Sequence, residues 1–316
     1  MNEQMPYDVV IVGGGPAGLS AALMLGRARK RAILFDAGSP RNAAATEIHN
    51  FATRDGIAPA EFRRIGREQL VPYPSIEVQD ARVDSIAPEG APFVVRVGER
   101  TLQARRVLLC VGMIDVLPDV PGYKELWGKS IFQCPYCHGW EVRDRPWGVV
   151  AQHPMMLEFA LMLTGWTRDL VVFTGGALAV PDELRARFAA ARIRIEERPI
   201  MALHGRDGHL EAVEVLGGDR VPREVLFAHP PQKQVPLVES LNLELDEMGY
   251  VKVDAFFKKT SVPGIHAAGD LTTMRQGAVG AANDGVLAAA GLNYALTIEA
   301  VSREAESVTL AAALGG

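Results

Sequence analysis

The stretch Tyr7-Asp8-Val9-Val10-Ile11-Val12-Gly13-Gly14-Gly15-Pro16-Ala17-Gly18 decides the fold of this 316-residue chain. Its first six residues read as a buried strand, its glycines follow the pattern G-x-G-x-x-G, and a helical pattern continues from Leu19 to Arg29. Strand, tight turn and helix in this order are typical of α/β proteins that hold a dinucleotide pyrophosphate at a helix N-terminus. The loop residues expected to contact the dinucleotide are Gly13, Gly15, Pro16, Ala17 and Gly18.

A second predicted strand, Arg31 to Phe35, ends in Asp36, roughly 20 residues beyond the glycine loop. An acid at this place accepts hydrogen bonds from a ribose 2′-hydroxyl and repels a 2′-phosphate. The pattern therefore favours FAD or NAD as the bound dinucleotide.

Residues near the C-terminus help to decide between FAD and NAD. Val262 to Asp270 reads as a short strand ending in Gly-Asp, and a helix of small residues is expected from Ala278 to Ala290. An aspartate at such a strand end can hold a ribitol hydroxyl, and the helix N-terminus can face the negative pyrimidine edge of a reduced flavin. These residues favour FAD, although alone they also fit an ordinary strand–helix turn.

Two of the three cysteines lie in one short loop, Cys134-Pro135-Tyr136-Cys137. Such a pair can close and reopen a disulfide, and one of its thiolates is the nucleophile of thiol–disulfide exchange. The third cysteine, Cys110, lies in the apolar run from Val107 to Val111 and reads as a small buried hydrophobe. The loop and the glycine motif together predict a flavoenzyme that moves electrons between a dithiol and FAD.

The amino-acid composition and the net charge further limit the class of protein. A hydrophobic content of 48% supports packed cores in about two domains, and a net charge of −5 argues against a nucleic-acid partner. No apolar run approaches the ~18 residues that span a bilayer, and no basic leader precedes the first strand. We therefore expect a cytoplasmic protein without membrane contact.

With these motifs assembled, the chain resembles the low-molecular-weight thioredoxin reductase family along nearly its whole length. The motifs that carry the resemblance, besides the glycine loop and the cysteine loop, are Ile48-His49-Asn50-Phe51, Leu109-Cys110-Val111-Gly112, Leu117 to Gly122, Gly249 to Asp254, Ala267 to Asp270 and Arg275-Gln276.

The resemblance implies an α/β fold with two Rossmann-like nucleotide-binding domains, assembled into a homodimer. The FAD domain would be discontinuous, with parts at 1–116 and 236–316, and the central domain at 117–235 would carry the cysteines. The resemblance also implies which residues contact each part of FAD. Asp36 would contact the adenosine ribose, and the backbone near Val83 would contact the adenine. Asp270 would contact the ribitol, Gln276 would lie at the flavin edge and Asn50 would lie beside the isoalloxazine. Gly112 and Arg275 lie in matching motifs and are expected to contact FAD as well.

The central domain departs from the family where NADPH would bind. Its strand, Trp147 to Val150, is followed by Ala151-Gln152-His153, where the family has three glycines. Side chains there would crowd a pyrophosphate. The next strand, Leu170 to Phe173, ends in Thr174-Gly175-Gly176 and offers no arginine for a 2′-phosphate. We read this nucleotide site as degenerate.

The residue after the second cysteine departs from the family too. His138 stands where thioredoxin reductases usually have aspartate, and Cys-Pro-Tyr-Cys-His-Gly-Trp-Glu resembles the dithiol oxidases of gliotoxin and holomycin type. Cys-x-x-Cys-His is also the haem-attachment pattern, but haem leaves the flavin motifs unexplained, and a structural zinc site needs four ligands. The resemblance assigns Cys134 as the substrate-facing sulfur and Cys137 as the inner one. His138 can accept the thiol proton.

Three functions remain open at this point. The leading one is an FAD-dependent oxidase that converts a dithiol to a disulfide and passes electrons to oxygen. The second is a reductase of a small-molecule or thioredoxin-like disulfide, fed by NADPH or by a donor such as ferredoxin. The third is a flavin-bound redox sensor without turnover.

Overall fold

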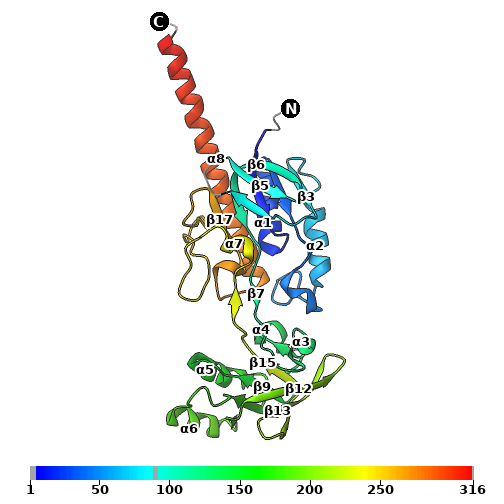
Figure 1. The fold of residues 1–316 in the computed structure, drawn as a ribbon. Coiled ribbons are helices and arrows are strands. Elements are labelled where there is room, and N and C mark those ends of the chain that lie inside the picture. The colour runs from blue at the N-terminus through cyan, green and yellow to red at the C-terminus, as the bar shows by residue number, and fades with distance from the viewer. Residues whose placement is uncertain (1–4, 88–91, 315–316) are drawn as a thin grey trace. The chain divides into compact units, whose positions relative to one another are not determined.

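The computed structural model describes residues 5–87 and 92–314. The chain divides into two compact units (Figure 1). Each unit has its own hydrophobic core. The first unit comprises Met1–Arg41, Pro59–Ile114 and Gln232–Gly316, and the second comprises Asn42–Ala58 and Asp115–Pro231. Two short strands, β7 (Ile114–Asp115) and β16 (Gln232–Lys233), lie where the chain passes from one unit to the other.

A mostly parallel sheet forms the centre of the first unit. Its strands follow the order β3 (Ile76–Gln79), β2 (Ala32–Phe35), β1 (Tyr7–Val12), β6 (Arg100–Leu109), β5 (Phe93–Val97) and β4 (Ser85–Ala87). Strand β17 (Ile265–Ala267) also pairs with β6, in parallel. The chain moves outward from β1 to β2 and β3 on one side, while β6 lies on the other side. In such sheets ligands bind outside the carboxyl end of the strand where the order reverses, which here is β1.

Both faces of this sheet are covered, which explains why its strands read as continuous apolar runs. Val10 and Val12 point into one core cluster, whereas Val9 and Ile11 point into the other, as the two-residue period of a strand requires. Helices α1 (Pro16–Arg27) and α8 (Ala278–Leu314) contribute to the second cluster. The unit also contains α2 (Pro59–Glu68), α7 (Pro236–Glu239) and the short 3-10 helices η1 (Arg41–Ala44), which runs into the second unit, and η2 (Asp270–Thr272).

Small residues bring α1 and α8 close together. A Cβ atom added to Gly285 would lie 2.0 Å from the carbonyl oxygen of Ala17, and Ala288 and Ala289 of α8 are fully buried. Helix α8 begins at Ala278, the residue predicted from the sequence. It continues far beyond the predicted end at Ala290, as the helix coloured orange to red in Figure 1 shows.

By length and composition alone, the segment Ala278–Ser307 of α8 contains an 18-residue stretch apolar enough to cross a membrane, and 33% of that stretch is buried inside the structure. The expectation that no apolar run approaches the ~18 residues that span a bilayer is therefore wrong. The alanines and glycines of α8 allow the close contact with α1, whereas its valine, leucine and isoleucine residues supply most of its hydropathy. Asp284 on the same helix forms an ion pair with Lys258 at 2.7 Å, so the first half of α8 packs as a core helix of its unit.

The second unit repeats the same arrangement on a smaller scale. Its parallel sheet has the order β11 (Arg194–Glu196), β10 (Leu170–Phe173), β9 (Trp147–Val150), β15 (Val225–Phe227) and β8 (Ile131–Phe132). An antiparallel sheet of β12 (Ile200–Arg206), β13 (His209–Val215) and β14 (Arg220–Pro222) packs within the same unit. The helices are α3 (Tyr123–Leu126), α4 (Pro135–His138), α5 (Pro154–Leu163) and α6 (Asp182–Ala190). Here the strand order reverses at β9, so the loop after β9 is the position of a second nucleotide site.

Candidate active site

The glycine loop after β1 is shaped by contacts that exclude side chains. Gly13 has φ +111°, and a Cβ atom on it would lie 2.2 Å from the carbonyl oxygen of Cys110. A Cβ atom on Gly18 would lie 1.9 Å from the carbonyl oxygen of Gly13, so α1 begins close to the loop. A Cβ atom on Gly15, by contrast, would have no neighbour within 4 Å. The loop is therefore packed on one side and open at Gly15.

The N-terminus of α1 has no side-chain cap. Gly15 is its N-cap residue, Pro16 and Ala17 begin its first turn, and no side chain among the described residues caps this end of the helix. The open space at Gly15 and these uncapped amides fit a pyrophosphate, which would accept hydrogen bonds there and interact favourably with the helix dipole.

Asp36 lies against this loop at the end of β2. Its Oδ1 accepts from the amide of Gly38 at 3.0 Å, and its Oδ2 accepts from Arg67 Nη2 at 2.8 Å. Arg67 also reaches Asp80 at 2.6 Å. Each Asp36 oxygen keeps a further lone pair, so the carboxylate can still accept from a ribose hydroxyl. Arg67 holds Asp36 in place and was not foreseen from the sequence.

A second polar cluster gathers Asp270, Gln276 and Arg41. Gln276 Oε1 accepts from Arg41 Nη1 at 2.6 Å, and Gln276 Nε2 donates to the backbone oxygen of Asp270 at 3.3 Å. Asp270 Oδ2 lies 3.5 Å from Arg41 Nη1, and Asp270 Oδ1 accepts from the amide of Gly277 at 3.3 Å. The expected residues Asp270 and Gln276 are thus brought together just before α8, and Arg41 joins them. No periodicity or motif marked Arg41, because its partners lie more than 200 residues away.

Three further residues expected to contact FAD, Gly112, Val83 and Arg275, lie outside these two polar clusters. Gly112 follows β6 with φ +66°, and a Cβ atom on it would meet nothing within 4 Å. Val83 is buried, and Arg275 is exposed with its amide bonded to the hydroxyl of Thr273. The thiol of Cys110 is buried, and burial, together with the charge of Asp284, raises its pKa, so it stays protonated and inert.

The loop after β9 in the second unit corresponds to the glycine loop, but a side chain caps the helix that follows it. His153 is the N-cap residue of α5, and its Nδ1 accepts from the amide of Met155 at 3.3 Å. Ala151 is fully buried, and Thr174 at the end of β10 is also buried. This helix N-terminus therefore already has a side-chain acceptor where a phosphate would bind.

The redox loop lies in the second unit, between β8 and β9. Cys134 and Cys137 form a disulfide, with their Cα atoms 5.2 Å apart. Cys134 is the N-cap residue of α4, and His138 is the last residue of that helix. The His138 ring stacks on Phe132 with 4.4 Å between ring centroids, and its Nδ1 is buried with no partner among the described residues. The disulfide thus has a histidine with a free ring nitrogen on the same short helix.

Burial lowers the pKa of His138 from its ordinary value, and the charge of His49 lowers it further, while Glu141 and a backbone hydrogen bond to Cys134 oppose the shift. His138 is therefore neutral near pH 7 and able to accept a proton.

The segment 42–58 groups with the redox loop. Asn50, expected beside the isoalloxazine, donates from Nδ2 to the carbonyl oxygen of Tyr136 at 2.6 Å. The neighbouring residue His49 lies within 3.5 Å of three carboxylates. The motif from Ile48 to Phe51 contains both residues, but it gave no indication of these contacts.

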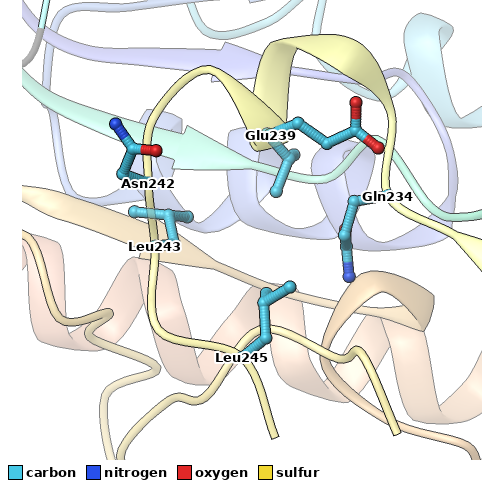
Figure 2. A pocket seen from close by; sticks show the side chains of 6 residues that line it. Gln234, Glu239, Asn242, Leu243 and Leu245 are labelled. Atoms are coloured by element: carbon cyan, nitrogen blue, oxygen red, sulfur yellow. The ribbon is translucent and has the colours of Figure 1, made fainter.

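A cavity of about 250 Å³ lies in the first unit, lined by Gln234, Val238, Glu239, Asn242, Leu243 and Leu245 (Figure 2). None of the expected site residues lines it.

Comparison with known proteins identifies the class of the chain. The family model of pyridine nucleotide-disulphide oxidoreductases matches residues 7–285, and the chain belongs to this family. Within it, the chain is a thioredoxin-reductase-like, FAD-dependent oxidoreductase, as the sequence resemblance predicted.

Three relatives show how far the likeness extends. Thioredoxin reductase tcpT of Claviceps purpurea is 36% identical over 283 residues, which cover 85% of this chain and 88% of the relative. The crystal structure of HlmI superposes with a TM-score of 0.90 at 35% identity and covers 99% of both chains. An oxidoreductase from Agrobacterium tumefaciens has a TM-score of 0.87 at 36% identity and covers 93% of this chain and 99% of its own.

Proposed function

We propose that this protein is an FAD-dependent dithiol oxidase, which converts a substrate dithiol to a disulfide through Cys134 and Cys137 and passes the electrons to oxygen. The proposal is supported above all by the redox disulfide and the neutral, half-buried His138 on one short helix. We further propose that the first unit is the FAD-binding domain, that the protein is a homodimer and that it is cytoplasmic.

In the proposed reaction a substrate thiolate attacks Sγ of Cys134, which forms a mixed disulfide and releases Cys137 as a thiolate. The second substrate thiol gives its proton to the ring of His138 and attacks the substrate sulfur of the mixed disulfide. Cys134 then leaves as a thiolate. Counting the proton that the first thiol releases to solvent when it ionises, the substrate has lost two electrons and two protons, and the cysteine pair holds both electrons.

The flavin would be held by the glycine loop, Asp36, Asp270 and Gln276. When bound, FAD would supply a two-electron acceptor for the cysteine pair, and the final products would be oxidised flavin and, from oxygen, two electrons and two protons, hydrogen peroxide.

The degenerate second loop supports an electron source other than NADPH. The N-terminus of α5 is capped by His153, and Ala151 fills the base of the loop. A nucleotide pyrophosphate would have to displace the histidine cap and accommodate side chains where NADPH-dependent relatives have glycine.

A disulfide reductase acting on a thioredoxin-like protein is the second candidate. Tyr136 and Trp140 beside the disulfide are 63% and 67% exposed, and such aromatic residues suit contact with a protein partner.

Anaerobic spectroscopy of the purified FAD-bound protein separates the two candidates. The flavin band near ~450 nm is followed after mixing with dithiothreitol in one cuvette and with NADPH in another, and air is then admitted to both. The oxidase predicts bleaching by the dithiol, little by NADPH, and recovery with peroxide formation in air. Fast bleaching by NADPH would overturn the proposal, and Cys134→Ser and Cys137→Ser variants show whether bleaching passes through the disulfide.

A further inference from the structure

Asn50 makes a direct contact with the redox loop inside the second unit. Its Nδ2 donates to the carbonyl oxygen of Tyr136 at 2.6 Å, and Tyr136 lies between the two cysteines. Both residues belong to the second unit, although Asn50 comes from segment 42–58 and Tyr136 from helix α4. The contact therefore joins two residues that are 86 positions apart in the chain.

This contact fixes one peptide group of the redox loop from both sides. The carbonyl oxygen of Tyr136 and the amide of Cys137 belong to the same planar peptide group. The oxygen accepts from Asn50, and the amide donates to the carbonyl oxygen of Cys134 at 3.2 Å. Helix α4 has only four residues, so its carbonyl groups depend on partners outside the helix. Asn50 therefore sets the orientation of the peptide group that leads into Cys137.

Asn50 is itself held in an uncommon backbone conformation. Its φ of +64° lies in the left-handed region, which few residues other than glycine and asparagine adopt. Its amide donates to Asp55 Oδ1 at 2.8 Å, and the amide of Ile48 closes the base of the loop by donating to the carbonyl oxygen of Ile57 at 2.8 Å. Because Asn50 lies at the surface, burial does not explain this conformation. The conformation instead directs the Asn50 side chain to the redox loop.

Two more contacts hold segment 42–58 against the same part of the unit. His49 Nε2 lies 3.5 Å from Glu141 Oε1, in the turn that follows α4. Shortly before β8, a Cβ atom on Gly128 would lie 2.7 Å from the Cβ atom of Ala44. The segment therefore loses contacts at several points if it moves away from the redox loop.

We propose that Asn50 is a positioning residue for the redox pair: by holding the carbonyl group of Tyr136, it favours the closed disulfide over the open dithiol. A disulfide requires its two cysteines within a narrow range, and the Cα atoms of Cys134 and Cys137 are 5.2 Å apart. Two thiols need more room than a disulfide, so a loop held in the closed arrangement resists opening. The role in catalysis rests on the proposed function, whereas the thiol–disulfide equilibrium can be measured without turnover.

The first test measures this equilibrium without following the flavin. The FAD-bound protein is equilibrated anaerobically with mixtures of reduced and oxidised dithiothreitol, quenched with acid, unfolded and labelled with a maleimide. Reduced dithiothreitol gives two electrons and two protons to the cysteine pair and becomes the cyclic disulfide. Because Cys110 is also labelled in the unfolded chain, mass spectrometry shows one label for the disulfide and three for the dithiol.

Two variants of Asn50 remove the donor in different ways. Asn50→Gly and Asn50→Ala both lack the amide, but only glycine adopts the left-handed conformation without strain. In both variants the equilibrium moves toward the dithiol by roughly threefold, the effect of one exposed hydrogen bond. Asn242→Gly is the matched control, because Asn242 is also an exposed asparagine with positive φ, +49°, but lies in the first unit. This variant leaves the equilibrium unchanged.

The second test follows the anaerobic bleaching of the flavin by dithiothreitol. After the substrate has opened the disulfide, the cysteine pair must close again to pass on its two electrons. Closing is slower in a loop that is not held in place. Bleaching is therefore about threefold slower in Asn50→Gly, although the disulfide of this variant is reduced more readily.

The outcomes separate this inference from the proposed function. If dithiothreitol fails to bleach the wild-type flavin, the proposed oxidase activity is wrong, and the labelling experiment still decides the role of Asn50. If only Asn50→Ala shifts the equilibrium, the cause is backbone strain and the inference is wrong. It is also wrong if neither variant shifts the equilibrium, even where bleaching slows, because Asn50 then acts elsewhere than on the cysteine pair.

Discussion

At the scale of single residues, Gly13 and Gly15 lie two positions apart in one loop and have opposite surroundings. Gly13 has φ +111° and a backbone oxygen 2.2 Å from the position of a Cβ atom, whereas Gly15 has ordinary extended dihedrals and open space. The first glycine is needed by the fold itself. The second is needed only if a ligand occupies the open space.

The two alanine variants therefore have different expected phenotypes. Gly13→Ala loses about 2 kcal/mol or more of unfolding free energy, because the backbone must shift to relieve the contact. Gly15→Ala loses less than about 1 kcal/mol but binds FAD much more weakly. Urea unfolding of the apoproteins and the ratio of FAD to protein after purification measure both effects. Normal FAD content in Gly15→Ala would contradict the placement of the pyrophosphate.

At the scale of elements, β17 carries a buried histidine that makes the stability of the sheet depend on pH. His266 is 3% exposed, and its Nδ1 bonds to the carbonyl oxygen of Phe257 at 2.8 Å. Burial lowers the pKa of His266 to about 4. The unfolded chain takes up this proton near pH 6.5, but the folded chain does not until about pH 4.

Stability is therefore full above pH 6.5 and falls as the pH drops toward 4. By pH 4.5 the cost from this histidine reaches about 2–3 kcal/mol. His266→Gln removes the titrating group, so the difference in urea midpoint between pH 7.5 and pH 4.5 becomes smaller than in the wild type. An unchanged difference would show that His266 is protonated in the folded state or is accessible to water.

The helix α5 offers a test of the altered nucleotide loop. His153→Ala removes the side chain that caps this helix, which costs about 0.5–1 kcal/mol, while the exposed neighbour Gln152 serves as control in Gln152→Ala. The measurement is the thermal midpoint of each variant. If both variants melt alike, the histidine is not a cap and would not compete with a phosphate at this helix N-terminus.

The sequence predicted some elements to the residue and others poorly, for identifiable reasons. Strands β1, β9 and β10 have the predicted bounds, because buried parallel strands are uninterrupted apolar runs closed by glycine or polar residues. The length of α8 was underestimated, since alanine and glycine show no apolar period. The contacts of Arg41 and Arg67, and the contact of His49 with Glu141, depend on partners distant in sequence, so no local pattern could reveal them.

At the scale of the whole molecule, two separate cores imply that the units need not unfold together. Each unit buries its own apolar clusters around its own sheet. A ligand that binds only the folded state stabilises the unit that holds it by about 2.7 kcal/mol at a hundredfold excess over its dissociation constant. If the first unit alone is the FAD domain, FAD should raise the midpoint of the unfolding transition of that unit and leave the midpoint of the other transition unchanged.

The chain provides its own probes for this prediction. All four tryptophans, Trp127, Trp140, Trp147 and Trp166, lie in the second unit, so tryptophan fluorescence follows that unit alone. Adding FAD to the apoprotein raises the midpoint of the first unit, seen by calorimetry and by FAD release, by several degrees. The tryptophan transition moves little, and Gly15→Ala abolishes the FAD effect. An equal rise of both transitions would mean that the units unfold as one cooperative body, and a rise of the tryptophan transition alone would place the flavin in the second unit.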